Sequence, residues 1–269
     1  MTDGYVMGRT SAEAERLQLQ AEILAPHSAH LFRLAGIVPG MRVLDVGCGA
    51  GDVSMLLADL VGPTGSVVGV DMNPTILELA RARTAEAGLA NVSFIEANLT
   101  GLRLDQPVDA LVGRLILMHL KEPAATVRSL CGSVRSGGVV SFQDYNVSRL
   151  RTIPPTPLTT RARSWILDAF RVVGVNGDIG DQIGSILQDA GLSVAGAAGA
   201  VAAGTADSVM PTYLADTVRT VLPVILAHGL ATEAEVDIDT MAERVTKELK
   251  ETGATFWTPE LAAAWARLP

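Results

Sequence analysis

The sequence has little cysteine, little histidine and no long hydrophobic run. Its two cysteines, Cys48 and Cys131, form neither a disulfide framework nor a metal-ligand spacing. Of the four histidines only His27 and His30 are close in sequence, and no acidic or thiol residue stands between them, so no metal site is expected. No apolar run approaches the roughly 18 to 20 residues that span a bilayer. The polar N-terminus also lacks the apolar core of a signal peptide, so we expect a cytoplasmic protein with no membrane contact.

Positive charge is also scarce. The formal net charge is −8, whereas a nucleic-acid-binding protein usually carries a basic face, so no nucleic-acid partner is expected. Hydrophobic residues make up 48% of the 269 residues and charged residues 19%, which is far from the composition of a disordered chain. The length suffices for one large domain with a substantial core. The composition leaves the oligomeric state open.

Strand and helix patterns alternate from about residue 10 to 142. Such alternation predicts an α/β fold, with a Rossmann-like, mostly parallel seven-stranded sheet, helices on both faces and helical cap insertions. The expected strands are 41–46, 66–70, 92–95, 109–112, 139–142, 193–203 and one within 255–268. The expected helices of the first half are 11–25, one from an Asp52 cap to Leu60, one between an Asn73 cap and Gly88, and one from Pro123 to before Gly137.

The segment Val43-Leu-Asp-Val-Gly-Cys-Gly-Ala-Gly51 carries the most chemical information. A strand runs into glycines at 47, 49 and 51, which let the backbone turn sharply and approach a ligand closely. The helix that follows offers free N–H groups and a partial positive charge. A phosphate-binding P-loop requires Lys-Ser/Thr after the last glycine, which is absent here. A dinucleotide-binding loop has the spacing G-x-G-x-x-G, whereas this loop has G-x-G-x-G.

The form Asp45-x-Gly47-Cys48-Gly49-x-Gly51 resembles motif I of the class I S-adenosylmethionine-dependent methyltransferases. The resemblance implies that this loop holds the methionine end of the cofactor. Further similarity to a bacterial small-molecule subfamily lies in the segment that begins at Tyr5, in Ser141-Phe-Gln-Asp-Tyr145, and in Phe256-Trp-Thr-Pro259. The implied cofactor is S-adenosylmethionine, with S-adenosylhomocysteine as product and a small-molecule acceptor as partner. Tyr5 is included among the cofactor-binding candidates.

Asp71 follows the second strand about 20 residues after the loop, where an acid is expected to accept both ribose hydroxyls. The alternative is that Asp71 only caps the turn Asp71-Met-Asn-Pro74. In the family that the chain resembles, the matching acid binds the adenosine ribose, and Met72 is then expected to lie against the adenine.

Two further segments complete the expected cofactor site. Asn98 stands where the family usually carries an Asp that accepts a bond from the adenine amino group, and its side-chain oxygen can still accept. Leu99 is expected beside the ring edge. A turn role for Asn98 is the alternative. Arg114, after the fourth strand, can pair with the methionine carboxylate, and a surface arginine is the alternative.

His119 and Tyr145 are the candidate catalytic residues. The free pKa of histidine lies near neutrality, so His119 is suited to act as a general base for a hydroxyl acceptor, although a packed structural histidine is the alternative. Trp165, Phe170 and Tyr213 are candidates for an apolar acceptor pocket, and ordinary core packing is the alternative. The segment from Arg149 to Arg171 contains five arginines, at 149, 151, 161, 163 and 171, but only one acidic residue, Asp168. These arginines could bind an anionic group of the acceptor. The alternative is that they form a solvated helix face that pairs with acids elsewhere in the protein.

The expected organisation has four parts. Residues 1–34 form an N-terminal helical lid and 35–146 the cofactor-binding core. Residues 147–190 form a helical cap insertion. Residues 191–269 complete the sheet, with a helical insertion at about 205–254 whose helices are interrupted at Pro211 and Pro223.

The sequence predicts a methyltransferase that acts by in-line displacement on an oxygen, nitrogen or carbon nucleophile. Two other functions remain open at this point. One is a nicotinamide-dependent oxidoreductase, and the other is a cofactor-binding family member that does not methylate.

Overall fold

The computed structural model describes residues 11–269, with side chains from Leu19 onward. The helices are α1 Ser11–Ala35, α2 Asp52–Val61, α3 Pro74–Glu86, α4 Pro123–Leu130, α5 Pro157–Val172, α6 Ile183–Asp189, α7 Met210–Ala227, α8 Glu233–Val236 and α9 Met241–Thr252. The strands are β1 Arg42–Val46, β2 Ser66–Asp71, β3 Val92–Glu96, β4 Val108–Arg114, β5 Val134–Asn146, β6 Arg151–Ile153, β7 Val194–Ala200, β8 Ala203–Gly204, β9 Thr255–Trp257 and β10 Glu260–Arg267.

These elements divide into two compact units. The sheet unit comprises Ala25–Asp144, Gly180–Gly199 and Ala262–Pro269. The helical unit comprises the described residues up to Leu24, with Tyr145–Ile179 and Ala200–Leu261.

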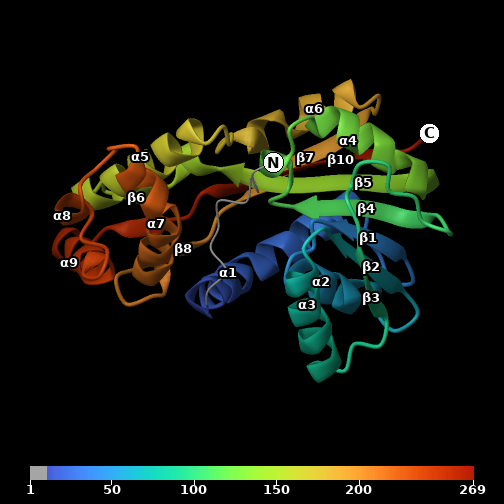
Figure 1. Ribbon diagram of the computed structural model, residues 1–269, viewed down its shortest axis with the longest axis horizontal. Coiled ribbons are helices and arrows are strands. Elements are labelled where there is room, and N and C mark those ends of the chain that lie inside the picture. Colours follow the sequence, from blue (N-terminus) through green and yellow to red (C-terminus); the bar gives the residue numbers. More distant parts are fainter. Residues whose placement is uncertain (1–10) are drawn as a thin grey trace. The chain divides into compact units, whose positions relative to one another are not determined.

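The main sheet has seven strands in the order β3-β2-β1-β4-β5-β10-β7, and strands β1 to β5 pair in parallel. The chain moves outward from β1 to β3 and then returns to β4 on the other side of β1. Because crossovers between parallel strands are right-handed, this reversal places α2 and α3 on one face and α4 on the other. Figure 1 shows α4 and α6 on one side of the sheet and α2 and α3 on the opposite side. The predicted fold class is confirmed.

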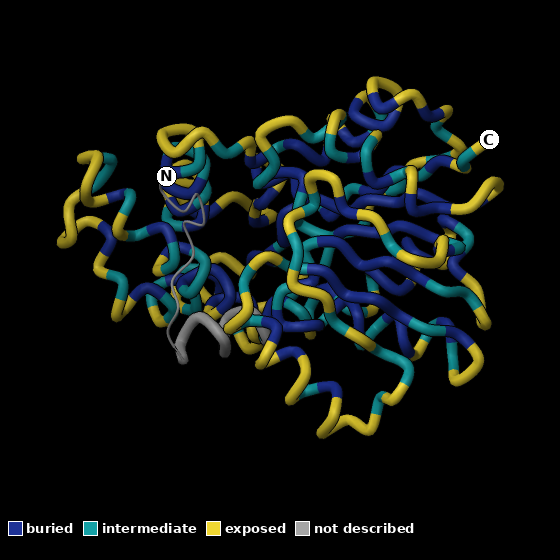
Figure 2. Tube along the Cα trace, turned by 45° about the vertical axis from the view of Figure 1, so that its right-hand side comes forward, coloured by how far each residue is buried: buried dark blue, intermediate teal, exposed yellow. Residues whose placement is uncertain are grey.

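One face of the sheet packs against the second half of α1 and against α2. Side chains that alternate along β1, β2, β4 and β5 form this contact, because successive residues of a strand point to opposite faces. The core residues are Phe32, Ala35, Val43, Leu57, Val61, Val67, Ala110, Val112 and Val139, all nearly or fully buried. Figure 2 shows the central strands buried and many of the turns at their ends exposed. The carboxyl ends of the strands are thereby fixed as a rigid platform.

The ends of α2 and α3 differ in how they are capped. Asn73 caps α3 as predicted, since its Oδ1 accepts hydrogen bonds from the backbone N–H groups of Thr75 and Ile76 at 3.1 and 3.4 Å. The predicted cap of α2 is wrong: Gly51 occupies that position in the left-handed region, and Asp52 is the first helical residue. A carboxylate in the first turn still interacts favourably with the helix dipole.

The helical unit contains α5, α7 and α9, which pack against one another, and a small sheet in the order β6-β9-β8. The expected interruptions at Pro211 and Pro223 are wrong, because α7 is continuous. Pro211 lies in the first turn, where no intrahelical N–H donor is required, and Pro223 is accommodated inside the helix. The single strand expected within 255–268 is two strands, β9 and β10, which belong to different sheets.

Two elements also extend beyond their predicted boundaries. The helix expected at 11–25 continues to Ala35 through Pro26, and the strand expected at 139–142 extends from Val134 to Asn146. The register of β5 against β4 shifts between Val108 and Ala110, which lets the strand pass through Gly137-Gly138. Among the helices that the structure describes, none is both long and apolar enough to cross a bilayer.

Candidate functional site

The glycine loop lies at the carboxyl end of β1 and is held against the end of β2. The backbone N–H groups of Gly47 and Cys48 both donate to the carbonyl oxygen of Val70, at 2.8 and 3.0 Å. Behind the loop, Arg83 of α3 donates to the Ala50 carbonyl at 2.8 Å and pairs with Asp52 at 2.7 Å. The loop is therefore fixed on both sides before any ligand binds.

The three glycines serve different purposes, although all have positive φ. A Cβ on Gly47 would lie 2.5 Å from Cδ1 of Ile116, and one on Gly51 would lie 3.2 Å from atoms of Ala80 and Phe94. These two glycines allow close packing within the protein. A Cβ on Gly49 would meet no described atom within 4 Å. Gly49 is therefore the loop glycine with open space beside it, as a ligand that approaches the backbone requires.

Asp71 joins the end of β2 to this loop. Its Oδ2 accepts the N–H of Gly49 at 3.0 Å, and its Oδ1 accepts the N–H of Asn73 at 3.0 Å. Both expected roles thus have a geometric counterpart, because the carboxylate caps its own turn and also contacts the loop. A carboxylate offers about four acceptor directions, so two remain for ribose hydroxyls. Met72, beside it, is 67% exposed, which is unusual for so apolar a side chain.

Asp45 stands at the opposite extreme of burial, with 1% of its surface exposed. Ser54 of α2 donates to its Oδ2 at 2.6 Å. Burial raises the pKa of Asp45 to about 7, although the Ser54 hydrogen bond and the positive charge of Arg114 act in the opposite direction. The carboxyl group is thus poised to exchange its proton near neutral pH. Within the loop, burial likewise raises the pKa of the Cys48 thiol, so this side chain stays protonated and packs as a small apolar group.

After β3, Asn98 is exposed and Leu99 is half-buried. The Oδ1 atom of Asn98 accepts the N–H of Thr100 at 2.8 Å, which is the contact that the turn alternative requires. An amide oxygen has a second lone pair, so this turn is compatible with a further bond to an adenine amino group. The adenine contact remains a prediction.

Arg114 ends β4 and lies beneath α1. Its Nη1 donates to Oγ of Ser28 at 3.1 Å, and its side chain is half-buried, which is not the surface position that was the alternative. The next residue, Leu115, has φ of 55° and donates its N–H to the Gln143 carbonyl at 2.8 Å. A left-handed leucine is strained, so this hydrogen bond keeps the chain in a sharp turn at the end of the sheet.

His119 closes a short 3-10 helix, Leu117–His119. This helix is attached to β5 through Asp144, whose Oδ2 accepts the N–H of Met118 at 3.3 Å. His119 is half-buried, and burial lowers its pKa from the ordinary value. The imidazole is therefore neutral at pH 7, the state that a general base requires, although a packed structural histidine has the same environment.

Tyr145 belongs to the helical unit and is nearly buried. Its hydroxyl lies 3.3 Å from that of Tyr213, which is 2% exposed. The structure thus brings together a candidate catalytic residue and a candidate pocket residue. Trp165 is also buried, whereas Phe170 is half-buried. Tyr5 lies outside the described residues.

The arginines of the predicted anion site have partners inside the helical unit. Arg149 pairs with Glu260 at 2.5 Å, Arg171 pairs with Asp168 at 2.5 Å, and Arg163 donates to the Leu150 carbonyl at 3.1 Å. Arg151 and Arg161 lie over the rings of Trp257 and Trp165. These contacts are those of the alternative, in which the arginines satisfy acids and other groups of the protein.

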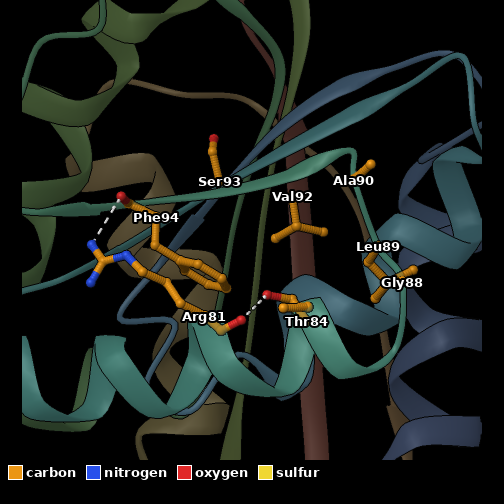
Figure 3. A pocket seen from close by; sticks show the side chains of 9 residues that line it. Arg81, Thr84, Gly88, Leu89, Ala90, Val92, Ser93 and Phe94 are labelled. Atoms are coloured by element: carbon orange, nitrogen blue, oxygen red, sulfur yellow. Dashed lines mark hydrogen bonds between the residues drawn. The ribbon is translucent and has the colours of Figure 1, made fainter.

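A cavity of about 520 Å³ lies elsewhere, between α3 and the edge strand β3 (Figure 3). Its lining residues are Arg81, Thr84, Ala85, Gly88, Leu89, Ala90, Val92, Ser93 and Phe94. Arg81 crosses it and donates to the Phe94 carbonyl at 3.3 Å. The cavity adjoins the first half of β3, whereas the glycine loop lies at the carboxyl ends of the strands. The chemistry of the loop is therefore the better guide to the functional site.

The sheet unit collects most of the predicted cofactor residues at one place. Asp71 is hydrogen-bonded to the loop at Gly49, and both Arg114 and Asp71 act electrostatically on Asp45. Sequence reasoning missed Ser54, which donates to Asp45, and Ser28, which contacts both Arg114 and Gln143. Gln143 stands among other polar residues of β5, including Ser141 and Asp144, so the sequence of the strand did not single it out. Within the described part of the chain, no group of three or more His, Cys, Asp or Glu residues is arranged to hold a metal ion.

Comparison with known proteins identifies a matching family and relatives of this chain. Residues 37–191 match the family described as "Methyltransferase domain". The chain is 36% identical over 117 residues to the ubiquinone/menaquinone biosynthesis C-methyltransferase UbiE of Ectopseudomonas mendocina, covering 43% of this chain and 46% of that protein. It is 32% identical over 136 residues to a ubiquinone biosynthesis O-methyltransferase of Paracidovorax citrulli, covering 48% and 56%. The chain thus spans about half the length of the curated relatives it matches.

Solved structures share the fold at lower identity. A putative methyltransferase from Bacillus halodurans has a TM-score of 0.58 at 17% identity, with 90% of this chain and 98% of that chain covered. The [4+2]-cyclase SpnF has a TM-score of 0.52 at 18% identity, with 90% and 81% covered. The family match spans more than half of the chain and includes the whole glycine loop, and it confirms the predicted family and its cofactor, S-adenosylmethionine. The chain therefore belongs to the methyltransferase-domain family, within the class I S-adenosylmethionine-dependent methyltransferases.

Proposed function

We propose that this protein transfers the methyl group of S-adenosylmethionine to a small-molecule acceptor. One observation carries the proposal: the Asp71 carboxylate receives the N–H of Gly49, in a loop with open space beside that glycine. An acid and a glycine loop in contact provide a ribose acceptor next to a backbone that a ligand can approach. Family membership supports the same assignment.

The residues of the sheet unit fit the cofactor in parts. Asp71 accepts the ribose hydroxyls with the two acceptor directions that Gly49 and Asn73 leave open. The exposed Met72 covers the adenine, with Asn98 and Leu99 at the ring edge. Tyr5, Cys48 and the other loop residues complete the proposed cofactor-binding set. Arg114 pairs with the methionine carboxylate and Asp45 lies close to the same end of the cofactor.

When bound, the cofactor supplies a methyl group that is already activated on a sulfonium, so the reaction is an in-line displacement. The protein then has two tasks, which are to align the acceptor and to exclude water. For a hydroxyl acceptor, His119 accepts the proton, because burial keeps its imidazole neutral at pH 7. Tyr145 orients the acceptor through its hydroxyl.

Acceptor choice is assigned to the parts outside the core: 1–34, 147–190 and the insertion at 205–254. The family match covers residues 37–191 and so leaves out the first and the last of these segments. The two relatives are named as C- and O-methyltransferases of quinone biosynthesis, so phenolic and hydroxyquinone compounds are the first acceptors to test. Tyr213 and Trp165 are the proposed pocket residues.

A non-methylating role is the second candidate, and a specific observation favours it. The fold is shared with a protein described as a [4+2]-cyclase, and one fold supports more than one chemistry. Both candidates predict binding of the cofactor. They differ in whether S-adenosylhomocysteine is formed.

The test has two stages. Calorimetry measures binding of S-adenosylmethionine, S-adenosylhomocysteine and NAD, and tight NAD binding without S-adenosylhomocysteine binding would favour the oxidoreductase alternative. A panel of phenols, hydroxyquinones and amines is then screened for S-adenosylhomocysteine formation. Methyl transfer to at least one acceptor supports the proposal, whereas cofactor binding with no product from any acceptor class favours the non-methylating role.

A further inference from the structure

A buried polar cluster joins α1 to the carboxyl ends of β4 and β5. It consists of Ser28, Arg114 and Gln143, all within the sheet unit. Ser28 and Gln143 are 0% exposed. The carbonyl oxygen of Ser28 accepts Nε2 of Gln143 at 3.3 Å, and the Oγ atom of Ser28 accepts Nη1 of Arg114 at 3.1 Å. One serine therefore orients both longer side chains.

The Ser28 carbonyl fixes which way the Gln143 amide faces. A carbonyl accepts but cannot donate, so the NH₂ group of Gln143 points toward it and Oε1 points away. Among the residues that the structure describes, this Oε1 atom has no hydrogen-bond partner, although it is shut off from solvent. An unsatisfied buried acceptor is costly, so its retention calls for a donor that is not part of the described chain.

The position of Gln143 indicates the chemistry of that donor. Gln143 and Arg114 are register partners on neighbouring parallel strands, at the end of the sheet where the glycine loop lies. In open α/β sheets, ligands bind beyond these carboxyl ends. A guanidinium beside an amide oxygen offers a donor for a carboxylate and an acceptor for an ammonium, which together complement the zwitterionic end of an amino acid.

We infer that Gln143 is a cofactor-binding residue whose Oε1 accepts a hydrogen bond from the ammonium group of the methionine moiety, beside the carboxylate held by Arg114. This inference rests on the proposed function, because it requires that the S-adenosyl cofactor binds at the glycine loop. It assigns a cofactor-recognition role to the β5 strand, in addition to the strands β1 to β4, whose carboxyl ends carry the sequence motifs.

Ser141 provides the matched control. It lies two residues earlier on β5, on the same face, is also 0% exposed, and its Oγ also has no partner among the described residues. It is farther from the carboxyl end of the strand. If both atoms merely bind an enclosed water molecule, substitutions at 141 and 143 should have similar effects.

The experiment compares three ligands by calorimetry on the full chain. S-adenosylhomocysteine carries both the ammonium and the carboxylate, its decarboxylated analogue keeps only the ammonium, and 5′-methylthioadenosine has neither. Gln143→Met preserves the length of the side chain but removes the acceptor. It should weaken the first two ligands about tenfold or more and leave the third unchanged, the scale of a hydrogen bond to a charged group. Ser141→Ala should leave all three affinities unchanged.

Equal weakening of all three ligands by Gln143→Met, or unchanged affinity in a folded variant, overturns the inference. If Gln143→Met does not fold, a structure of the wild-type complex with S-adenosylhomocysteine decides: an amino nitrogen more than about 3.5 Å from Oε1 overturns it equally. Wild-type protein that binds none of the three ligands contradicts the proposed function instead.

Discussion

The Gly49→Ala variant tests whether the open side of the glycine loop is the cofactor site. Gly49 has φ of 52°, and its missing Cβ would meet no described atom within 4 Å. The methyl group therefore adds no clash within the described protein, and the remaining cost is the left-handed backbone of an alanine, about 1 kcal/mol. In the complex, the same methyl group projects into the space proposed for the cofactor. We expect cofactor affinity to fall at least tenfold.

Gly88→Ala is the matched control. Gly88 also has a positive φ, 68°, and open space where its Cβ would lie, but it follows α3 at the other end of the strands. Both variants should lose about the same stability in urea unfolding, since both place alanine in the left-handed region. Calorimetry with S-adenosylhomocysteine should show reduced affinity for Gly49→Ala and wild-type affinity for Gly88→Ala.

Either of two outcomes would contradict this prediction. Unchanged affinity in Gly49→Ala would mean that the open space is not the cofactor site. A stability loss for Gly49→Ala far above that of Gly88→Ala would mean that the loop packs more tightly than the geometry indicates. Gly47→Ala sets the scale for that second case, because its Cβ would lie 2.5 Å from Ile116.

Three other predictions concern titratable residues. Asp71→Ala should weaken S-adenosylhomocysteine by roughly 1.5–3 kcal/mol in calorimetry without unfolding the protein, and unchanged affinity would reduce Asp71 to a turn cap. His119→Gln should lower turnover and leave the cofactor Kd unchanged. Because burial lowers the pKa of His119 from 6.5, the variant should also lose an ionisation below that pH from the pH–rate profile. A variant that merely loses stability would favour a packing role. Burial raises the pKa of Asp45 from 3.8 to about 7, so the folded protein holds this proton to a higher pH than the unfolded chain. Its contribution to the free energy of unfolding is full below pH about 4 and is lost as pH rises toward 7, on the order of 4 kcal/mol in total; Asp45→Asn should flatten this slope in urea unfolding of the ligand-free protein, and an identical slope in both proteins would contradict the assignment.

The parts of the fold that sequence predicted well are those governed by local rules. Asn73 followed by Pro74 is a favoured helix start that depends on local sequence alone, and the structure has the expected cap bonds there. The glycine loop was found because a turn with positive φ at three nearby positions requires glycine. The cap of α2 was assigned to Asp52 instead of Gly51, because an acid at a helix start fits both the cap and the first turn.

The errors in the helical unit have a different cause. Proline usually ends a helix, but Pro211 falls in a first turn and Pro223 is tolerated within α7, an outcome that depends on packing against α5 and α9. The small sheet was missed because β8 is a two-residue strand in an Ala/Gly-rich stretch. Its partner β9 lies some fifty residues later in the sequence, so no local sequence pattern predicts the pairing of the two strands.

Gln143 shows where sequence reasoning stops for the functional site. In the sequence it is one of several polar residues of β5, among them Ser141 and Asp144, and the alternation of β5 says only that it shares a face with Ser141. Its distinguishing property is that Ser28, 115 residues away on α1, fixes its amide and leaves Oε1 without a donor among the described residues. A contact of this kind depends on how a helix is laid across the ends of two strands. The sequence motifs predict Asp71 at the ribose and Arg114 at the methionine carboxylate, whereas the proposed role of Gln143 at the ammonium group follows only from tertiary packing.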